Sequence, residues 1–124
     1  MNQVYVSIGS NIHPQENIRQ LLEILTQDFG EIRVSEFVKT KPIGIEDQAD
    51  FVNGAVVFET ELDQVQLQKY LKSVENKLGR DRSLPKFGPR TMDLDLVVWN
   101  GIVVDDDFYT RDFLRKSIES IGFK

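Results

Sequence analysis

Residues 88–99 read GPRTMDLDLVVW, and the interpretation of the whole chain starts from this stretch. From Met92 onward it has the apolar residues of a β-strand, interrupted only by Asp93 and Asp95. Side chains on a strand alternate between its two faces, so both carboxylates should point the same way, about 6.6 Å apart along the strand. Two acids on one face of an apolar strand are costly unless a cation lies between them.

A basic segment, RDRSLPKFGPR at residues 80–90, comes directly before the acidic strand. Paired carboxylates beside a loop rich in cations, proline and glycine suit a magnesium–polyphosphate site. The alternative is a solvated loop next to an ion-paired strand end. An Asp-x-Asp pattern alone does not separate these two interpretations.

Composition narrows the classes of function. The 124 residues are enough for one domain, and the net charge of −5 argues against affinity for nucleic-acid backbone or anionic membrane. The absence of cysteine excludes disulfides and thiolate chemistry, and the single histidine, His13, excludes a histidine-based catalytic triad. With no leader-like or long apolar segment in the sequence, we expect a soluble, cytoplasmic monomer.

Hydrophobic periodicity predicts the order β-α-β-β-α-β. Helices are expected from residue 14 to a C-cap at Gly30, and from an N-cap at Asp63 to residue 78. Strands are expected at 4–8, 32–39, 51–60 and 92–99, followed by a short strand at 102–104 and a terminal helix from residue 111. This order predicts a ferredoxin-like α+β sandwich, an antiparallel sheet with both helices on one face, plus a short β/α appendage at the C-terminus. The other sheet face would then be free for a ligand.

The strand predicted at 51–60 has two distinct faces. Val52, Val56 and Phe58 share one, whereas Asn53 and its apolar neighbours, Phe51, Ala55 and Val57, share the other. An asparagine in this setting either hydrogen-bonds backbone or, beside an aromatic ring, suits a flat heterocycle. The long connection over residues 40–50 before this strand is of the kind that often forms a lid.

Five sequence blocks together resemble the 6-hydroxymethyl-7,8-dihydropterin pyrophosphokinase family. They occur in that family's order and spacing, cover residues 4 to about 100, and are far more specific as a set than singly. The blocks are YVSIGSN (5–11), TKPIG (40–44), DFVN (50–53), Glu75 with LGRDR (78–82), and GPRTMDLD (88–95).

The resemblance implies a single pyrophosphokinase-like domain over residues 1–124. Such an enzyme transfers the pyrophosphoryl group of ATP to 6-hydroxymethyl-7,8-dihydropterin and releases AMP, in folate biosynthesis. It also implies two Mg²⁺ ions held by Asp93 and Asp95. The residues implied to be catalytic are these two aspartates, Arg82 and Arg90. The residues implied to bind ATP are Lys72, Glu75, Arg82, Lys86, Arg90, Leu96 and Arg111. Those implied to bind the pterin are Thr40, Lys41, Ile43, Phe51, Asn53, Phe87 and Phe113.

Two features leave alternatives open. Lys72 and Glu75 could form an ordinary i, i+3 ion pair instead of facing the nucleotide. The sequence also departs from the family after the acidic strand: residues 105–110 read DDDFYT where the family has a histidine-containing segment. The chain could therefore be a working kinase, a paralogue with altered specificity, or a non-catalytic nucleotide- or pterin-binding protein. An RNA-binding ferredoxin-like module is a further hypothesis, which the acidic charge disfavours.

Overall fold

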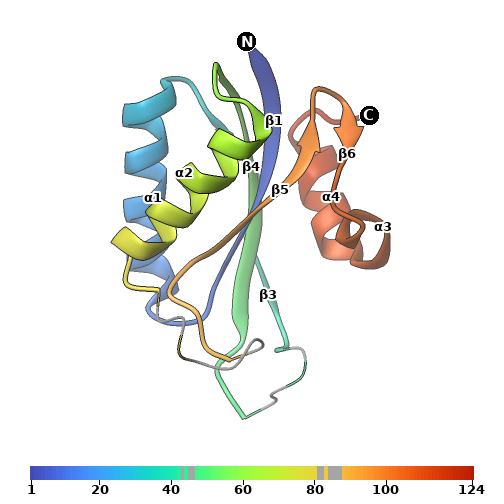
Figure 1. The fold of residues 1–124 in the computed structure, drawn as a ribbon. Helices are drawn as coiled ribbons and strands as arrows, with labels where there is room; N and C mark the ends of the chain where they lie inside the picture. The colour runs from blue at the N-terminus through green and yellow to red at the C-terminus, as the bar shows by residue number, and fades with distance from the viewer. Residues whose placement is uncertain (43, 45–46, 81–82, 84–87) are drawn as a thin grey trace.

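The computed structural model describes residues 1–42, 44, 47–80, 83 and 88–124, and its ribbon is shown in Figure 1. Its strands and helices are β1 (Asn2–Ser10), α1 (Pro14–Phe29), β2 (Arg33–Val34), β3 (Val38–Thr40), β4 (Phe51–Thr60), α2 (Gln64–Lys77), β5 (Asp93–Trp99), β6 (Ile102–Val103), α3 (Asp107–Thr110) and α4 (Asp112–Ser120). None of the helices in these described ranges is long and apolar enough to cross a membrane.

The strands form one antiparallel sheet in the order β2-β4-β1-β5-β6, and β3 also pairs with β4. The central pair is the longest, running from Asn2 opposite Thr60 to Ser10 opposite Val52. β5 flanks β1 on the other side, so the acidic strand lies next to the centre of the sheet. This order, with α1 and α2 connecting the strands, confirms the predicted ferredoxin-like architecture.

Helices α1 and α2 cover one face of the sheet, as predicted (Figure 1). The Asp63 carboxylate accepts the Gln66 backbone N–H, and the Gln66 side chain accepts the Asp63 N–H, forming a capping box that starts α2. The periodic apolar residues of both helices are buried against β1, β4 and β5. The fully or nearly fully buried ones are Ile18, Leu21, Leu25, Leu67, Leu71 and Val74.

The opposite face of the sheet is only partly free, which corrects one expectation. Helix α4 packs on it through Leu114 and Ile118, and Phe108 of the unpredicted helix α3 joins the same apolar cluster. Figure 1 shows α3 and α4 on the side of the sheet away from α1 and α2. The β5 residues Val97 and Val98 both enter this cluster because the register between β1 and β5 shifts beside them. Among the described residues, the end of the face that carries Asp93 is left open.

The strand predicted at 32–39 is interrupted, giving β2 and β3. Val34 lies opposite Val56 and Val38 opposite Asn53, so the edge strand carries one extra residue between these points. The Ser35 hydroxyl accepts the Ala55 N–H at 2.8 Å and replaces a backbone partner at the interruption. The ring of Phe37 lies so close to Gly54 that a Cβ on residue 54 would come within 2.6 Å of it. The Phe37 ring therefore packs against the backbone of β4 at the interruption.

Candidate active site

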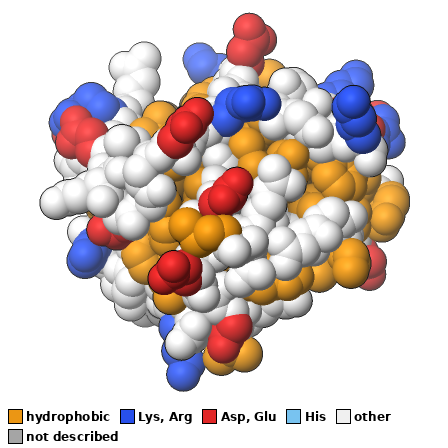
Figure 2. Space-filling view, turned by 90° about the horizontal axis from the view of Figure 1, so that it is seen from above, with side chains coloured by type: hydrophobic (Ala, Val, Ile, Leu, Met, Phe, Trp, Pro, Cys, Tyr) orange, Lys and Arg blue, Asp and Glu red, His pale blue; other side chains and the backbone are white. Residues whose placement is uncertain are grey.

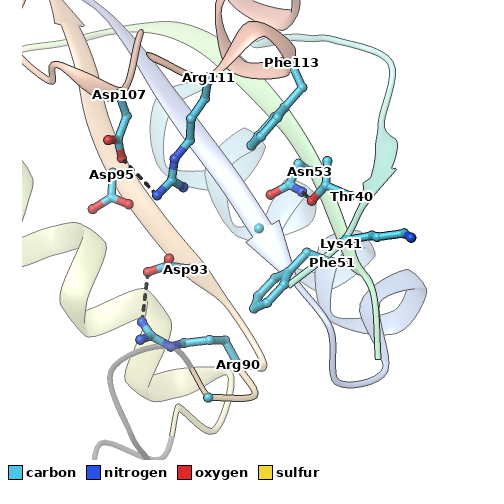
Figure 3. Close-up of a pocket in the computed structure, with 12 residues that line it drawn as sticks. Thr40, Lys41, Phe51, Asn53, Arg90, Asp93, Asp95, Asp107, Arg111 and Phe113 are labelled. Atoms are coloured by element: carbon cyan, nitrogen blue, oxygen red, sulfur yellow. Dashed lines mark hydrogen bonds and ion pairs between the residues drawn. The ribbon is translucent and has the colours of Figure 1, made fainter. Parts of the chain in front are cut away.

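Asp93 lies opposite Gly9 of β1, and Asp95 lies opposite Ser7. The alternate residues Leu94 and Leu96 are buried in the core that the helices cover. Both carboxylates therefore project from the same sheet face, as the alternation of side chains predicts. Figure 3 shows the two side chains entering one cavity from β5.

This cavity, which we call the Asn53 cavity, has a volume of about 310 Å³. The Asn53 amide donates a hydrogen bond to the Thr40 hydroxyl, and the rings of Phe51 and Phe113 extend toward the cavity from opposite sides (Figure 3). Gly9 lies beneath them, where a Cβ would sit 3.0 Å from Asn53 Oδ1. The described residues implied to bind a pterin all line this cavity: Thr40, Lys41, Phe51, Asn53 and Phe113. The Lys41 amino group, however, points away from the carboxylates.

A second cavity, the Lys72 cavity, lies along α2 and β5 and has a volume of about 860 Å³. It contains Lys72, Glu75 and Leu96, three of the residues implied to bind ATP. Val65 and Val104 add apolar surface, and Lys69 adds a cation that the sequence interpretation did not include. The two cavities share Arg90, Asp93 and Asp95. The acidic pair and one arginine therefore stand where the two spaces meet.

The two carboxylates differ in their ion pairs. Asp93 Oδ1 lies 3.4 Å from Arg80 Nη1 and 3.6 Å from Arg90 Nη1. Within the described part of the chain, Asp95 has no ion-pair partner. Its side chain reaches solvent at the cavity mouth, but the cavity walls reduce its hydration.

This environment raises the pKa of Asp95 to about 7. Loss of hydration is the largest cause, and repulsion from Asp93, Asp105, Glu75 and Asp107 adds to it. A carboxyl group crowded by other carboxylates is a place where a bound cation would relieve repulsion.

The donor set fits Mg²⁺ that also binds phosphate. Among residues 1–42, 44, 47–80, 83 and 88–124 there is no group of three or more acids, histidines or cysteines arranged to hold a metal alone. Mg²⁺ typically uses one or two protein carboxylates and takes its other ligands from water and substrate phosphates. Asp93 and Asp95 match that requirement.

Arg90 is fixed through its backbone. The Asn11 side-chain oxygen accepts the Arg90 N–H at 2.7 Å, and the Arg90 carbonyl accepts the N–H groups of Asn11 and Ile12. The Asn11 amide also donates to Gln48 and to the Ala49 carbonyl, at 2.8 and 2.9 Å. A single buried asparagine thus joins the start of α1, the segment before β4 and the residue that ion-pairs with Asp93.

The Arg111 side chain lies in the Asn53 cavity and not in the Lys72 cavity. Its Nη2 is 3.8 Å from Asp107 Oδ2, the ion pair marked by a dashed line in Figure 3. Glu75 lines the Lys72 cavity, but its carboxylate is 3.4 Å from Arg80 and accepts the Leu94 N–H. Both side chains therefore form ion pairs with neighbouring residues of the site.

Four residues named from the sequence, Ile43, Arg82, Lys86 and Phe87, lie outside the described residues. Besides Lys69, the residues of the site that the sequence interpretation missed include Asn11, Arg80 and Asp107. Asn11 and Arg80 stood within the resembling blocks without an assigned role. Asp107 could have been found from its i, i+4 spacing to Arg111, which is the spacing of a helical ion pair.

Comparison with known proteins identifies the family of the chain. Residues 5–122 match the model of the 7,8-dihydro-6-hydroxymethylpterin-pyrophosphokinase family. The chain is 40% identical over 102 residues to the 2-amino-4-hydroxy-6-hydroxymethyldihydropteridine pyrophosphokinase of Bacillus subtilis, covering 80% of this chain and 60% of that protein. It is 34% identical over 125 residues to the Haemophilus influenzae protein of the same name, covering 92% and 78% of the two chains.

A third protein of that name, from Pseudomonas aeruginosa, is 34% identical over 108 residues, covering 85% of this chain and 66% of its own length. The matched region thus spans 60% to 78% of these three relatives. Since the family model matches nearly the whole sequence, the chain belongs to the 7,8-dihydro-6-hydroxymethylpterin-pyrophosphokinase family.

Proposed function

We propose that this protein transfers the β,γ-diphosphoryl group of ATP to the hydroxymethyl group of 6-hydroxymethyl-7,8-dihydropterin, a step of folate biosynthesis. The observation that carries the proposal is the meeting of two cavities at Arg90, Asp93 and Asp95. One cavity suits a flat heterocycle and the other a nucleotide, and the acids stand where a phosphoryl group would pass between them.

The Asn53 cavity has the chemistry to hold the pterin. Phe51 and Phe113 offer aromatic faces for a planar ring, and the amide of Asn53 offers both a donor and an acceptor for its polar edge. The Thr40 hydroxyl holds the Asn53 amide in one orientation. In the Lys72 cavity, Leu96 and Val104 suit an adenine, while Lys72 and Arg90 suit its phosphates.

In the proposed reaction the hydroxymethyl oxygen forms a bond to Pβ of ATP. The bond from Pβ to the oxygen that bridges it to Pα breaks, AMP leaves with that oxygen, and the hydroxyl proton passes to solvent. Such transfers have loose transition states, so orientation and charge neutralisation supply most of the catalysis. Arg90 and Arg111 lie on two sides of the carboxylates, where each can donate to phosphate oxygens.

Asp93 and Asp95 would hold Mg²⁺, two ions when ATP is bound, which when present neutralise phosphate charge and acidify the attacking hydroxyl. The chain's own contribution is to keep both carboxylates on one strand face at the boundary of the cavities. Before a cation binds, Arg80 and Arg90 partly neutralise Asp93 and so reduce its repulsion of Asp95.

The direct test measures AMP release from ATP and 6-hydroxymethyl-7,8-dihydropterin, with and without Mg²⁺. We expect pterin- and Mg²⁺-dependent AMP, and a loss of at least about a thousandfold in Asp95→Asn. Asp112→Asn, which removes an exposed acid that pairs with Arg115 outside both cavities, is the control and should keep full activity. Tight binding of ATP and pterin without AMP release would instead indicate a non-catalytic binding protein.

An RNA-binding role has little support. The sheet face that such a module would use is covered at Ala55 and Val57 by the apolar cluster around α4. Figure 2 shows basic side chains dispersed among acidic and apolar ones on the face seen from above. That distribution differs from a continuous basic surface.

A further inference from the structure

We infer that Glu75 is a positioning residue, which acts through Arg80 to hold the start of β5 and to keep Asp93 available for a cation. The inference deepens the proposed function and rests on it. It differs from the role suggested by sequence resemblance, in which Glu75 contacts the nucleotide.

Glu75 is buried, with 4% of its surface exposed, and its two oxygens have different partners. Oε2 accepts the Leu94 N–H at 2.8 Å, whereas Oε1 lies 3.4 Å from Arg80 Nη1. Buried charges of this kind persist only when they are paired and hydrogen-bonded. Although Glu75 lines the Lys72 cavity, its carboxylate thus binds β5 and Arg80 within the described part of the chain.

Arg80 extends the link from α2 to the acidic strand. The same nitrogen, Nη1, lies 3.3 Å from the Met92 carbonyl and 3.4 Å from Asp93 Oδ1. The Arg80 side chain is only 12% exposed, so water competes weakly for these contacts. Glu75 thus reaches the strand twice, once directly at Leu94 and once through Arg80 at Met92 and Asp93.

This double attachment matters because of where β5 lies in the sheet. On its outer side β5 pairs with β6 only at Val98 and Trp99, according to the described residues. The first half of the strand, with both aspartates, thus has β1 alone as a strand neighbour. Glu75 supplies an acceptor to the Leu94 N–H where a further strand would otherwise do so.

The charges give the second part of the inference. Arg80 is shared between two carboxylates, so Glu75 offsets part of its positive charge and leaves Asp93 more negative. If the Glu75 charge were removed, Asp93 would be the remaining acidic partner of Arg80 among the described residues. A cation approaching Asp93 would then compete with a stronger ion pair.

The test substitutes each member of the link separately. Glu75→Gln keeps a carbonyl oxygen for the Leu94 N–H but removes the charge. We expect it to weaken Mn²⁺ binding about three- to tenfold. Arg80→Gln should instead strengthen Mn²⁺ binding, because Asp93 loses one cation, and the double variant should behave like Arg80→Gln. Mn²⁺ is titrated by electron paramagnetic resonance with α,β-methylene-ATP saturating, so the readout is metal affinity and not turnover.

Glu23→Gln on α1 is the matched control, since it removes an exposed glutamate that pairs with Arg19, and it should leave Mn²⁺ binding unchanged. If Glu75→Gln raises the KM for ATP while Mn²⁺ affinity stays at the wild-type value, Glu75 contacts the nucleotide and the inference is wrong. It is also wrong if both single variants shift Mn²⁺ affinity in the same direction. Wild-type protein that releases no AMP would overturn the proposed function separately. If Glu75→Gln is unfolded by circular dichroism, the sign of the Arg80→Gln effect decides the question.

Discussion

Two arginine–aspartate pairs line the Asn53 cavity, and they differ in the exposure of their arginines and in how they are attached to the fold. The inner pair, Arg90–Asp93, has an N–O separation of 3.6 Å, and the outer pair, Arg111–Asp107, has one of 3.8 Å. The Arg90 side chain is 14% exposed, whereas that of Arg111 is 37% exposed. A similar separation therefore corresponds to a stronger interaction at the inner pair, where water screens less.

The two pairs also differ in how they are attached. Asn11 accepts the Arg90 N–H, and Arg80 supplies Asp93 with a second cation, so two other segments of the chain fix the inner pair. The outer pair lies within one helical turn, where the Arg111 N–H donates to the Asp107 carbonyl at 2.9 Å. The inner pair is thus part of the fold, while the outer one is a local feature of the α3–α4 junction.

If this contrast governs catalysis, Arg90→Gln should have the largest effect of the substitutions in these two pairs. We expect kcat/KM for AMP release to fall at least about a hundredfold, because a preorganised donor at a desolvated site is lost. Steady-state AMP release with both substrates measures it.

Arg115→Gln is the matched control for Arg90→Gln. Arg115 pairs with Asp112 and Glu119 on α4, outside both cavities, so its loss should change kcat/KM by less than about twofold. An Arg90→Gln variant that keeps a third of wild-type activity would contradict the contrast between the two pairs.

Local sequence patterns predicted the part of the site that the acidic strand β5 carries. The alternation of residues 93–97 placed both aspartates on one face, and the periodic apolar residues of α1 and α2 placed the helices on the other. Strand β4 was predicted with its observed bounds, and its two faces enter the two different clusters. These features follow from spacing along one element, which a sequence displays directly.

The positions of α3, α4 and the edge strand depend on packing between distant segments, which the spacing of residues along the sequence does not reveal. The course of α4 over the sheet is set by contacts of Leu114 and Ile118 with residues of β1, β4 and β5. At the break between β2 and β3, Phe37 packs against Gly54, a contact between positions 17 residues apart. The i, i+4 spacing of Asp107 and Arg111 indicates their ion pair, but the position of Asp107 in the cavity depends on where α3 lies in the fold.

The pH dependence of stability sharpens the comparison at Asp95, which lacks the cations that its neighbour Asp93 has. The pKa of Asp95 is about 7 in the folded chain, above its ordinary value of 3.8. Protonation of Asp95 therefore stabilises the folded state. This contribution to stability is fully present below about pH 4 and is lost as the pH rises through 7. Asp95→Asn removes that titration, so its free energy of unfolding should exceed the wild-type value at pH 8 but not at pH 4.

Because Asp95 is partly solvated, we expect a difference of only about 1 kcal/mol at pH 8. Urea denaturation of both proteins at pH 4, 6 and 8 measures it, and other titrating groups cancel in the comparison. A difference that is equal at the three pH values would mean that Asp95 titrates as an ordinary aspartate.

Asp107→Asn should have the smallest effect, since two consequences oppose each other. Losing the ion pair frees Arg111 to leave the cavity, which weakens its contact with phosphate, while losing a carboxylate reduces repulsion of the anionic nucleotide. We expect kcat/KM for AMP release to change by less than about threefold, with Asp112→Asn as a control of the same charge change. A tenfold loss in Asp107→Asn alone would mean that the outer pair holds Arg111 as firmly as Asn11 and Arg80 hold the inner one. Exposure and attachment would then be poor guides to which arginine matters.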